Sequence, residues 1–445
     1  MAGQSASFEK YQEHAGAKKL SKEIEGMIKN LDTLPVSSPK HCCIYKVKDH
    51  IRKSNEKAYT PQVISIGPFH HYNPTLQTMK RFKLSYLKSF TERAERKLKD
   101  IVSTIKSAEE SVRESYSETI QYLDSDDFVK MILLDASFII EYFWKNKTLN
   151  WTDEDREILE PWLCNRMQMD FILLENQLPF FIIEKIYDIA FPSLSKNNPF
   201  IELTFRQFEY YNVQISQYSP STKILHFTDL VRNFCMPPSE RRLKGKSQKM
   251  MEICSAAQLV ELGLKFKKRE SSNNINWSPL ELKYADGVLE IPRFQLDDTT
   301  EIYARNLVAL EKYHHPYKDE AYITDYYTLL SFLIKTVKDM DVLVREQIID
   351  NWLDGVVATS MINKLSGEKC FNIQTNSHYH KMAEELNKFY TDRARMTYYV
   401  IMRPLKREYF YNPWRGAATI GGSLLLLLTV TQTVCALISV MKNWE

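Results

Sequence analysis

The sequence predicts a mainly α protein: a multi-helical body with a small antiparallel β-hairpin element and one C-terminal transmembrane helix. Apolar residues recur at helical spacing through most of the 445 residues, and no charged residue occurs between Gly416 and Met441. The hydrophobic fraction of 44% is typical of a packed core. A net charge of +3 gives no sign of a concentrated basic face, so we expect no nucleic acid as a partner.

Composition shifts divide the chain into successive parts. Met236-Pro237-Pro238 ends a short helix, and the basic stretch RRLKGKSQK follows, which is typical of a solvated linker. The expected parts are an N-terminal helical or flexible extension (1–40), an N-terminal helical domain (41–235), a basic linker (236–250), a C-terminal α domain with the β-hairpin (251–412), a transmembrane anchor (413–441) and a short tail (442–445).

The N-terminal domain is expected to consist of amphipathic helices around an apolar one. Residues 79–92 carry a broad apolar stripe, and a longer polar helix is expected over residues 97–123. Residues 128–143 are apolar almost all round, which predicts a central helix. Residues 170–187 (DFILLENQLPFFIIEKIY) repeat this character, with Pro179 dividing them into two helices.

The C-terminal domain is expected to combine helices with the hairpin. Residues 280–284 alternate, Asp286-Gly287 supplies a tight turn, and residues 288–291 return; residues 264–266 are the candidate for a third strand. Asp298 and Glu301 have the spacing of a capping pair. Helices are expected over residues 227–234, 255–262, 301–313, 326–338, 342–353 and 379–396.

The C-terminal apolar stretch is long enough to cross a bilayer, which needs roughly 20 apolar residues. Aromatic residues lie at both ends, as is usual at the headgroup level. The tail beyond it is so short that insertion is expected after synthesis, as in a tail-anchored protein. Residues that mark this single-pass membrane span are Gly416, Leu424, Leu428, Gln432 and Met441.

Basic residues predict the orientation of the anchor. Four precede the span and one follows it, so the positive-inside rule places the body in the cytosol, at the plasma membrane or an endomembrane. No signal peptide is recognisable at the N-terminus, although three glycosylation triplets favour the opposite side. The basic residues are Arg403, Lys406, Arg407, Arg415 and Lys442, and the triplets start at Asn146, Asn150 and Asn276.

Small residues in the span leave self-association open. Ala417 with Gly421 and Ala418 with Gly422 form small-xxx-small pairs, and Gln432 is polar, so a homo-oligomer through this helix is one expectation. The alternative is that these small residues merely terminate a loosely packed helix. Seven scattered cysteines without a C-x-x-C pair predict a reducing compartment.

Four long motifs resemble a known family. They are the stretch from IYKV at residue 44 through AYTPQVISIGPFHHY to MKRFKLSYL, then LLENQLPFFIIEKIY, IPRFQLDDTTEIYARNLVALEK and YFYNPWRGAATIGGSLLLLLTVTQT. Over residues 41–435 the chain resembles the plant-specific DUF247 (UPF0481) family. The resemblance implies a plant protein with one C-terminal membrane segment and no assigned catalytic residues. Some grass relatives look like pollen-side determinants of self-incompatibility, so the resemblance implies a recognition role.

Catalytic and metal motifs are largely missing from the sequence. Gly245-Lys246-Ser247 lacks the glycine that a phosphate loop needs five residues earlier, where Glu240 stands, and no G-x-S-x-G occurs. His378 and His380 have a spacing that suits metal ligation from a strand but not from one helix face. We therefore expect no metal, no cofactor and no assigned catalytic residue.

His70, His71 and Glu175 are the candidates for a cleft. The two histidines follow Gly67-Pro68 in a turn, where an imidazole can act as a general base. The other interpretation is a hydrogen-bonded structural role. For Glu175, with the neighbouring Asn176 and Gln177, the favoured interpretation is capping of the helix that Pro179 breaks.

The sequence favours a membrane-tethered interaction or recognition protein of plants without catalytic activity. Its expected partners are the lipid bilayer and other proteins, and confinement at a membrane would raise its effective concentration near them. The alternatives are an enzyme of unrecognised class that uses the His70, His71 and Glu175 cleft, and an ion-conducting or lipid-handling assembly of paired anchors.

Overall fold

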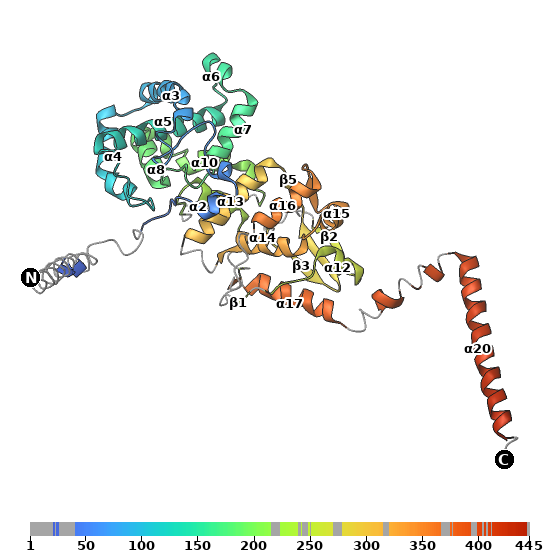
Figure 1. Cartoon of the computed structure of the whole chain (residues 1–445). Helices are drawn as coiled ribbons and strands as arrows, with labels where there is room; N and C mark the ends of the chain where they lie inside the picture. The colour runs from blue at the N-terminus through green and yellow to red at the C-terminus, as the bar shows by residue number, and fades with distance from the viewer. Residues whose placement is uncertain are drawn as a thin grey trace, which may run out of the picture. The chain divides into compact units, whose positions relative to one another are not determined.

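The computed structural model divides into two compact units, each described here by itself (Figure 1). Unit 1 comprises Met1–Asp49, Tyr59–Gln207 and Tyr218–Leu230, and unit 2 comprises His50–Ala58, Phe208–Gln217 and Val231–Glu445. The structure describes residues 21–22, 24–25, 41–214, 223–238, 242, 248–249, 251–269, 278–314, 320–365, 374–375, 377–392, 398–402, 405, 408–410 and 412–442.

Helix α5 (Ser125–Thr148) is the centre of unit 1. Side chains on every face of it are buried, and helices packed around it cover those faces, as Figure 1 shows. Asp124 caps its start by accepting a hydrogen bond from the Asp127 N–H, and Leu149 ends it in the left-handed conformation. The predicted central helix is confirmed. Its neighbours are α3 (Lys80–Arg93), α4 (Leu98–Arg113), α8 (Phe180–Ala190) and α10 (Phe200–Gln207).

Two helix predictions in unit 1 are wrong in part. The helix expected to reach residue 123 ends at Arg113, whose guanidinium turns back and donates to the Ile120 and Leu123 carbonyls. Residues 171–179 are not helical, although Pro179 does precede α8. The shorter helices of unit 1 are η3 (Pro74–Met79), α6 (Asp153–Ile158), α7 (Pro161–Asp170) and α9 (Pro192–Ser195).

Three helices contain a boundary between the units along the chain. They are α2 (Asp49–Arg52), η2 (Glu56–Tyr59) and α11 (Phe227–Cys235). Helix α11 ends before Met236-Pro237-Pro238, as predicted, because proline cannot continue the hydrogen-bond pattern.

Unit 2 combines helices with short strands. In its three-stranded sheet, β3 (Lys283–Ala285) and β4 (Val288–Pro292) form the predicted antiparallel hairpin, and β2 (Lys265–Arg269) pairs with β4 in parallel. Asp286 and Gly287 both have positive φ, the geometry of a two-residue hairpin turn. The helices are η4 (Glu209–Tyr211), α12 (Ala256–Glu261), α13 (Asp298–Tyr313), α14 (Tyr322–Leu333), α15 (Val337–Arg345), α16 (Gly355–Leu365), α17 (Ser377–Thr391) and the π-helix η7 (Tyr398–Met402).

Tertiary contacts override several local predictions in unit 2. The capping residue of α13 is Asp297, which accepts from the Thr299 and Thr300 N–H groups, so the expected Asp298–Glu301 pair is wrong by one position. The helix expected over residues 342–353 is wrong in its second half. There β6 (Ile349–Asn351) pairs in parallel with β5 (Phe294–Leu296).

The boundary between the helices expected over residues 326–338 and 342–353 is also displaced, because α14 ends at Leu333 and α15 begins at Val337. Part of the basic stretch is a strand, because β1 (Gln248–Lys249) pairs with β7 (Gln374–Thr375). Arg242 forms an ion pair with Glu320. Arg241, Lys244, Gly245, Lys246 and Ser247 lie outside the described residues.

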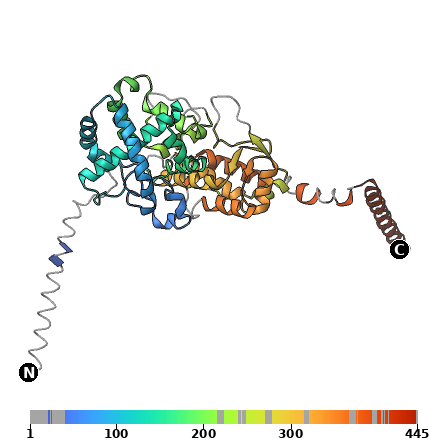
Figure 2. The ribbon, with the colours of Figure 1, turned by 90° about the horizontal axis from the view of Figure 1, so that it is seen from above.

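Helix α20 (Pro413–Lys442) is one continuous helix, which can be followed in Figures 1 and 2. Its segment Pro413–Ser439 has a mean hydropathy of 1.8, and none of this window is buried within the structure. By length and composition, this helix can cross a membrane. Most of the predicted N-terminal extension lies outside the described residues, as do Asn276, Arg403, Lys406 and Arg407.

Candidate functional site

His70 and Glu175 lie together in unit 1. Nε2 of His70 is 3.2 Å from Oε2 of Glu175, and their side chains are 13% and 1% exposed. Nε2 of His70 has no hydrogen-bond partner among the described residues, so the two groups lie close together without a hydrogen bond between them. The other carboxylate oxygen of Glu175 accepts from the Val47 N–H at 2.7 Å. The structure therefore brings together two of the three residues of the predicted cleft, and binds one of them to the backbone.

The third candidate, His71, is half-buried, and burial lowers the pKa of its imidazole. Asp135 and Lys83 contribute opposing charges to its environment. These two residues form a buried ion pair, in which the Lys83 ammonium also donates to the Ser65 carbonyl. The second carboxylate oxygen of Asp135 accepts from the Gly67 N–H at 2.8 Å. Asp135 therefore forms an ion pair with the Lys83 ammonium and also accepts a hydrogen bond from a backbone N–H.

Asp135, Asp170 and Asn176 form a polar cluster that supplies hydrogen-bond acceptors to the backbone N–H groups of residues 62–67. The Asp170 carboxylate accepts from three successive N–H groups, at 2.9, 2.7 and 2.8 Å, those of Gln62, Val63 and Ile64. Asn176 accepts from the Ile66 N–H and donates to the Ile64 carbonyl. A mostly buried segment that is neither helix nor strand needs such acceptors, because a buried N–H left unpaired is costly.

Gln177 completes the arrangement in a way that differs from simple capping of α8. Its amide oxygen accepts from the Phe227 N–H at the start of α11, and its amide nitrogen donates to the Phe171 and Leu173 carbonyls. No cap hydrogen bond is formed at the start of α8 by a side chain. The chain passes close to this point at Gly67, where a Cβ atom would stand 2.3 Å from the Gln177 carbonyl oxygen. Glycine is therefore required there.

His226 is a further buried group that the sequence interpretation did not single out. Its Nε2 lies 3.0 Å from the Cys43 carbonyl, and its Nδ1 accepts from the Asp229 N–H. These two partners require the neutral tautomer with the proton on Nε2. Burial lowers the pKa of the imidazole to about 4. Functionally, His226 caps α11 and holds the chain near Cys43.

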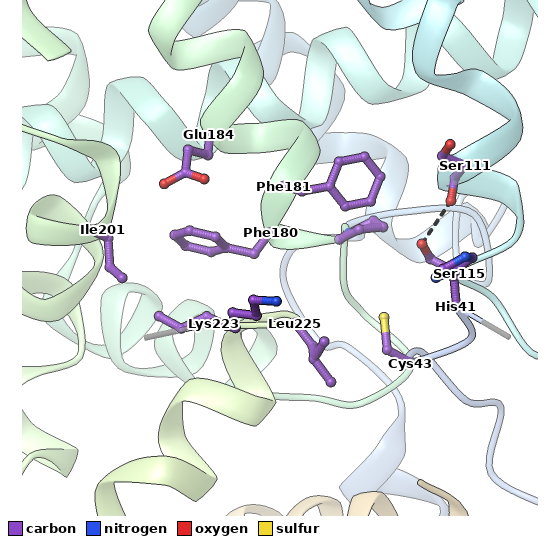
Figure 3. Close-up of a pocket in the computed structure, with 12 residues that line it drawn as sticks. His41, Cys43, Ser111, Ser115, Phe180, Phe181, Glu184, Ile201, Lys223 and Leu225 are labelled. Carbon is purple, nitrogen blue, oxygen red and sulfur yellow. Dashed lines mark hydrogen bonds between the residues drawn. The ribbon is translucent and has the colours of Figure 1, made fainter. Parts of the chain in front are cut away.

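A separate cavity of about 660 Å³ opens at the start of α8 (Figure 3). The rings of Phe180 and Phe181 lie in the middle of this view, with Glu184 on the same helix, and Ser115 donates to the Ser111 carbonyl at 3.0 Å. Burial raises the pKa of the Cys43 thiol, so this cysteine is a poor nucleophile at neutral pH. His70, His71 and Glu175 do not line this cavity.

The second histidine pair lies on α17. His378 and His380 are two positions apart on a helix and therefore point in different directions, and both are half-buried rather than facing solvent. Burial lowers the pKa of His378. Among the described residues, no three His, Cys, Asp or Glu side chains are grouped so that they could hold a metal ion.

Lys83, Asp135 and Asp170 are the important site residues that sequence interpretation missed. A signal was present for one of them, because Asp135 interrupts an otherwise apolar helix (MILLDASF), where an ionised side chain needs a buried partner. Lys83 and Asp170 gave no comparable signal. Lys83 occupies a helix with other lysines, and Asp170 is a single acidic residue at the C-terminal end of α7.

The amino-acid sequence matches the model of a known protein family. The model of DUF247, described as a plant protein of unknown function, matches residues 44–428. The chain belongs to the DUF247 family. The matched region contains the segment around residues 62–71 and the LLENQLP motif, which carry most of the polar residues described above.

Two plant proteins illustrate the relationship. The UPF0481 protein At3g47200 of Arabidopsis thaliana is 25% identical over 433 residues, covering 90% of this chain and 87% of that protein. The putative UPF0481 protein At3g02645 of the same plant is 28% identical over 156 residues, covering 34% of this chain and 28% of that protein. No solved structure matches the chain.

The Lys83–Asp135 pair is predicted to be strongly coupled. Lys83→Met alone leaves a buried carboxylate without its cation and should lower the free energy of unfolding by about 3–5 kcal/mol. The double variant Lys83→Met/Asp135→Asn should be at least about 1 kcal/mol more stable than Lys83→Met, because no uncompensated charge remains. Urea unfolding of the full chain in mild detergent, followed by circular dichroism, measures both.

The exposed pair Lys106–Asp126, with side chains 56% and 73% exposed, is the matched control. Lys106→Met should leave the free energy of unfolding nearly unchanged, because water and salt screen an exposed pair. Strictly additive effects of the Lys83 and Asp135 substitutions would contradict the buried-pair assignment.

Acid should destabilise unit 1 through His226. Its folded pKa of about 4 lies below the unfolded value near 6.5, so the unfolded state binds more protons between these values. Stability from this group is present above pH 6.5 and falls on acidification, by on the order of 3 kcal/mol at pH 4. His226→Asn keeps a capping acceptor for the Asp229 N–H and should reduce this pH dependence. Unfolding midpoints in urea between pH 4 and 7 measure it, and an unchanged pH profile in the variant would refute the assignment.

Proposed function

We propose that this protein is a membrane-anchored interaction protein whose helical body binds protein partners close to a lipid bilayer. The observation that carries the proposal is helix α20, an apolar helix without a buried face. Its 30 residues extend roughly 45 Å at 1.5 Å per residue, which matches a bilayer including its headgroups. In water, the exposed leucines would be costly, whereas lipid tails satisfy them.

The flanks of α20 agree with a span. Tyr409, Phe410 and Trp414 are exposed at its N-terminal end, where aromatic rings favour the headgroup region. The polar side chains of the helix are also compatible with a bilayer, because the hydroxyls of Thr429, Thr431 and Thr433 donate to carbonyls one turn earlier within the helix. The excess of basic residues before the span supports a cytosolic body, at the plasma membrane or an endomembrane.

Interaction, rather than catalysis, is the activity that the two units support best. In unit 1, the carboxylates of Asp135, Asp170 and Glu175 accept backbone N–H groups, which leaves them little capacity for a substrate. In unit 2, large apolar side chains are exposed near the start of α16, with Trp352 at 71% and Val356 at 65%. Exposed apolar side chains near each other are typical of a protein-binding surface.

An enzyme of unrecognised class is the second candidate, and the contact between His70 and Glu175 is the observation that favours it. A carboxylate beside an imidazole is a common arrangement for a general base. Against it stands the near-complete burial of Glu175, since a substrate has to reach the reacting groups.

The membrane part of the proposal predicts resistance to alkaline carbonate. In plant microsomes, the intact chain should stay in the pellet after carbonate extraction and dissolve in detergent. Leu426→Arg places a charge in the middle of α20, which is unfavourable for insertion by about 2.5–3.5 kcal/mol, and should move much of the chain to the supernatant. Leu426→Ile is the matched control. Release of the intact chain by carbonate would contradict the proposal.

Two further readouts address orientation and partners. In sealed microsomes, added protease should digest the body if it faces the cytosol, whereas protection would reverse the orientation. Proximity labelling with the full chain should return membrane-associated proteins, fewer of them for Trp352→Ser/Val356→Ser. The exposed Tyr72→Ser substitution in unit 1 serves as the control. A background-level result for the unmodified chain would contradict the interaction function.

A further inference from the structure

A second cavity, of about 320 Å³, lies wholly within unit 2. It is formed by η4, β5, the start of α13 and α14. Its volume is at the small end of the range found for ligand pockets, roughly 300–1,000 Å³. Trp352, Val356 and the residues of α20 do not line this cavity.

Aromatic rings dominate the lining of this cavity. Tyr211 and Tyr303 are stacked, with ring centroids 5.6 Å apart and planes within 5° of parallel. Tyr326 meets Phe294 edge-to-face at 6.4 Å, and Tyr327 at 5.6 Å. Rings held in this way by their neighbours form rigid walls, against which a flat apolar molecule can pack at little entropic cost.

Two of the tyrosines bring hydrogen-bond donors that lack partners. Tyr326 and Tyr327 are 4% and 6% exposed and line the cavity, yet neither hydroxyl forms a hydrogen bond to another described residue. By contrast, the Tyr303 hydroxyl lies 2.6 Å from Sγ of Cys235. Burial raises the pKa of Tyr326 and Tyr327, which keeps both as neutral donors. An acceptor atom inside the cavity would satisfy them.

The charged groups of the lining are already engaged. The Arg293 guanidinium donates to Asp350 at 2.7 Å. The Asp297 carboxylate accepts from the Thr299 and Thr300 N–H groups at 2.9 and 3.0 Å. A charged ligand would lose its hydration in an aromatic cavity and find no uncommitted counter-charge in return, so the lining disfavours it.

We propose that this cavity binds a small, uncharged aromatic molecule whose carbonyl oxygen accepts a hydrogen bond from Tyr326 or Tyr327. Its rings pack against the tyrosine and phenylalanine walls. The ligand class is therefore a neutral aromatic ketone, bound within unit 2. This activity is independent of membrane anchoring and of partner binding.

Benzophenone tests the proposal because it is a neutral aromatic ketone that forms covalent bonds to nearby C–H groups under ultraviolet light. The full chain in mild detergent is irradiated with increasing benzophenone, and labelled peptides are identified by mass spectrometry. Saturable labelling is expected in peptides that contain residues 210–213, 294–303 and 322–327. Labelling that does not saturate, or that is concentrated on α20, would overturn the proposal.

Matched probes and variants sharpen the test. The anion 4-benzoylbenzoate should label these peptides at least tenfold less at pH 7, and equal labelling would overturn the preference for an uncharged ligand. Val213 lines the cavity and is 49% exposed, so Val213→Trp can block the cavity without overfilling a core. This variant should lower labelling at least fivefold, and unchanged labelling would place the probe elsewhere.

The hydroxyls are tested separately. Tyr326→Phe/Tyr327→Phe keeps both rings and should raise the half-saturating benzophenone concentration about five- to tenfold, as expected for one lost hydrogen bond. Tyr187→Phe, which removes a hydroxyl bonded to the Asn198 carbonyl in unit 1, should leave the half-saturating concentration unchanged. Equal affinity of the double variant and this control would overturn the assigned donors.

Discussion

Unit 1 depends on one constraint: the N–H groups of a mostly buried segment, residues 62–67, need acceptors, and no strand among the described residues supplies them. Asp170, Asn176 and Asp135 take this role for residues 62–67. Each acceptor comes from a different part of the chain, respectively the end of α7, the loop before α8 and the middle of α5. Satisfying one segment therefore fixes the mutual placement of three elements.

The use of carboxylates as acceptors places negative charge in the core of unit 1. A carboxylate in the core has to be compensated, and Lys83 does so for Asp135. Unit 2 uses the same device, because Glu311 accepts from the buried Arg232 guanidinium and from the Thr324 N–H. Burial raises the pKa of Glu311, and Arg232 opposes this shift. Such pairs add little net stability, but they penalise alternative packings in which a charge would lose its partner.

The elements that local pattern decides were predictable. The apolar helix α5, the hairpin with its Asp286-Gly287 turn and the helix α20 each depend on residues close together in the chain. The elements that distant contacts decide were not. Strand β6 forms because Ile349–Asn351 meets Phe294–Leu296, more than fifty positions earlier, and no short window contains that information.

The residues of the candidate site also fall into those that the sequence indicated and those that it did not. Histidines after a Gly-Pro turn and a glutamate between apolar segments were recognisable as unusual, and His70 and Glu175 do meet. Their neighbours Lys83 and Asp170 were not recognisable, because their partners are separated from them by 52 and about 107 positions. The sequence therefore identified polar residues of interest but not that most of them bind backbone groups.

Amide hydrogen exchange of residues 62–67 tests this account most directly, measured on the full chain in mild detergent by mass spectrometry. If side-chain acceptors hold these N–H groups, the amides of residues 63, 64, 66 and 67 will exchange about as slowly as those in the middle of α5. Exchange as fast as in the exposed loop around Tyr72 would mean that the polar cluster does not hold the segment. The structural role of Asp135, Asp170 and Asn176 would then be wrong.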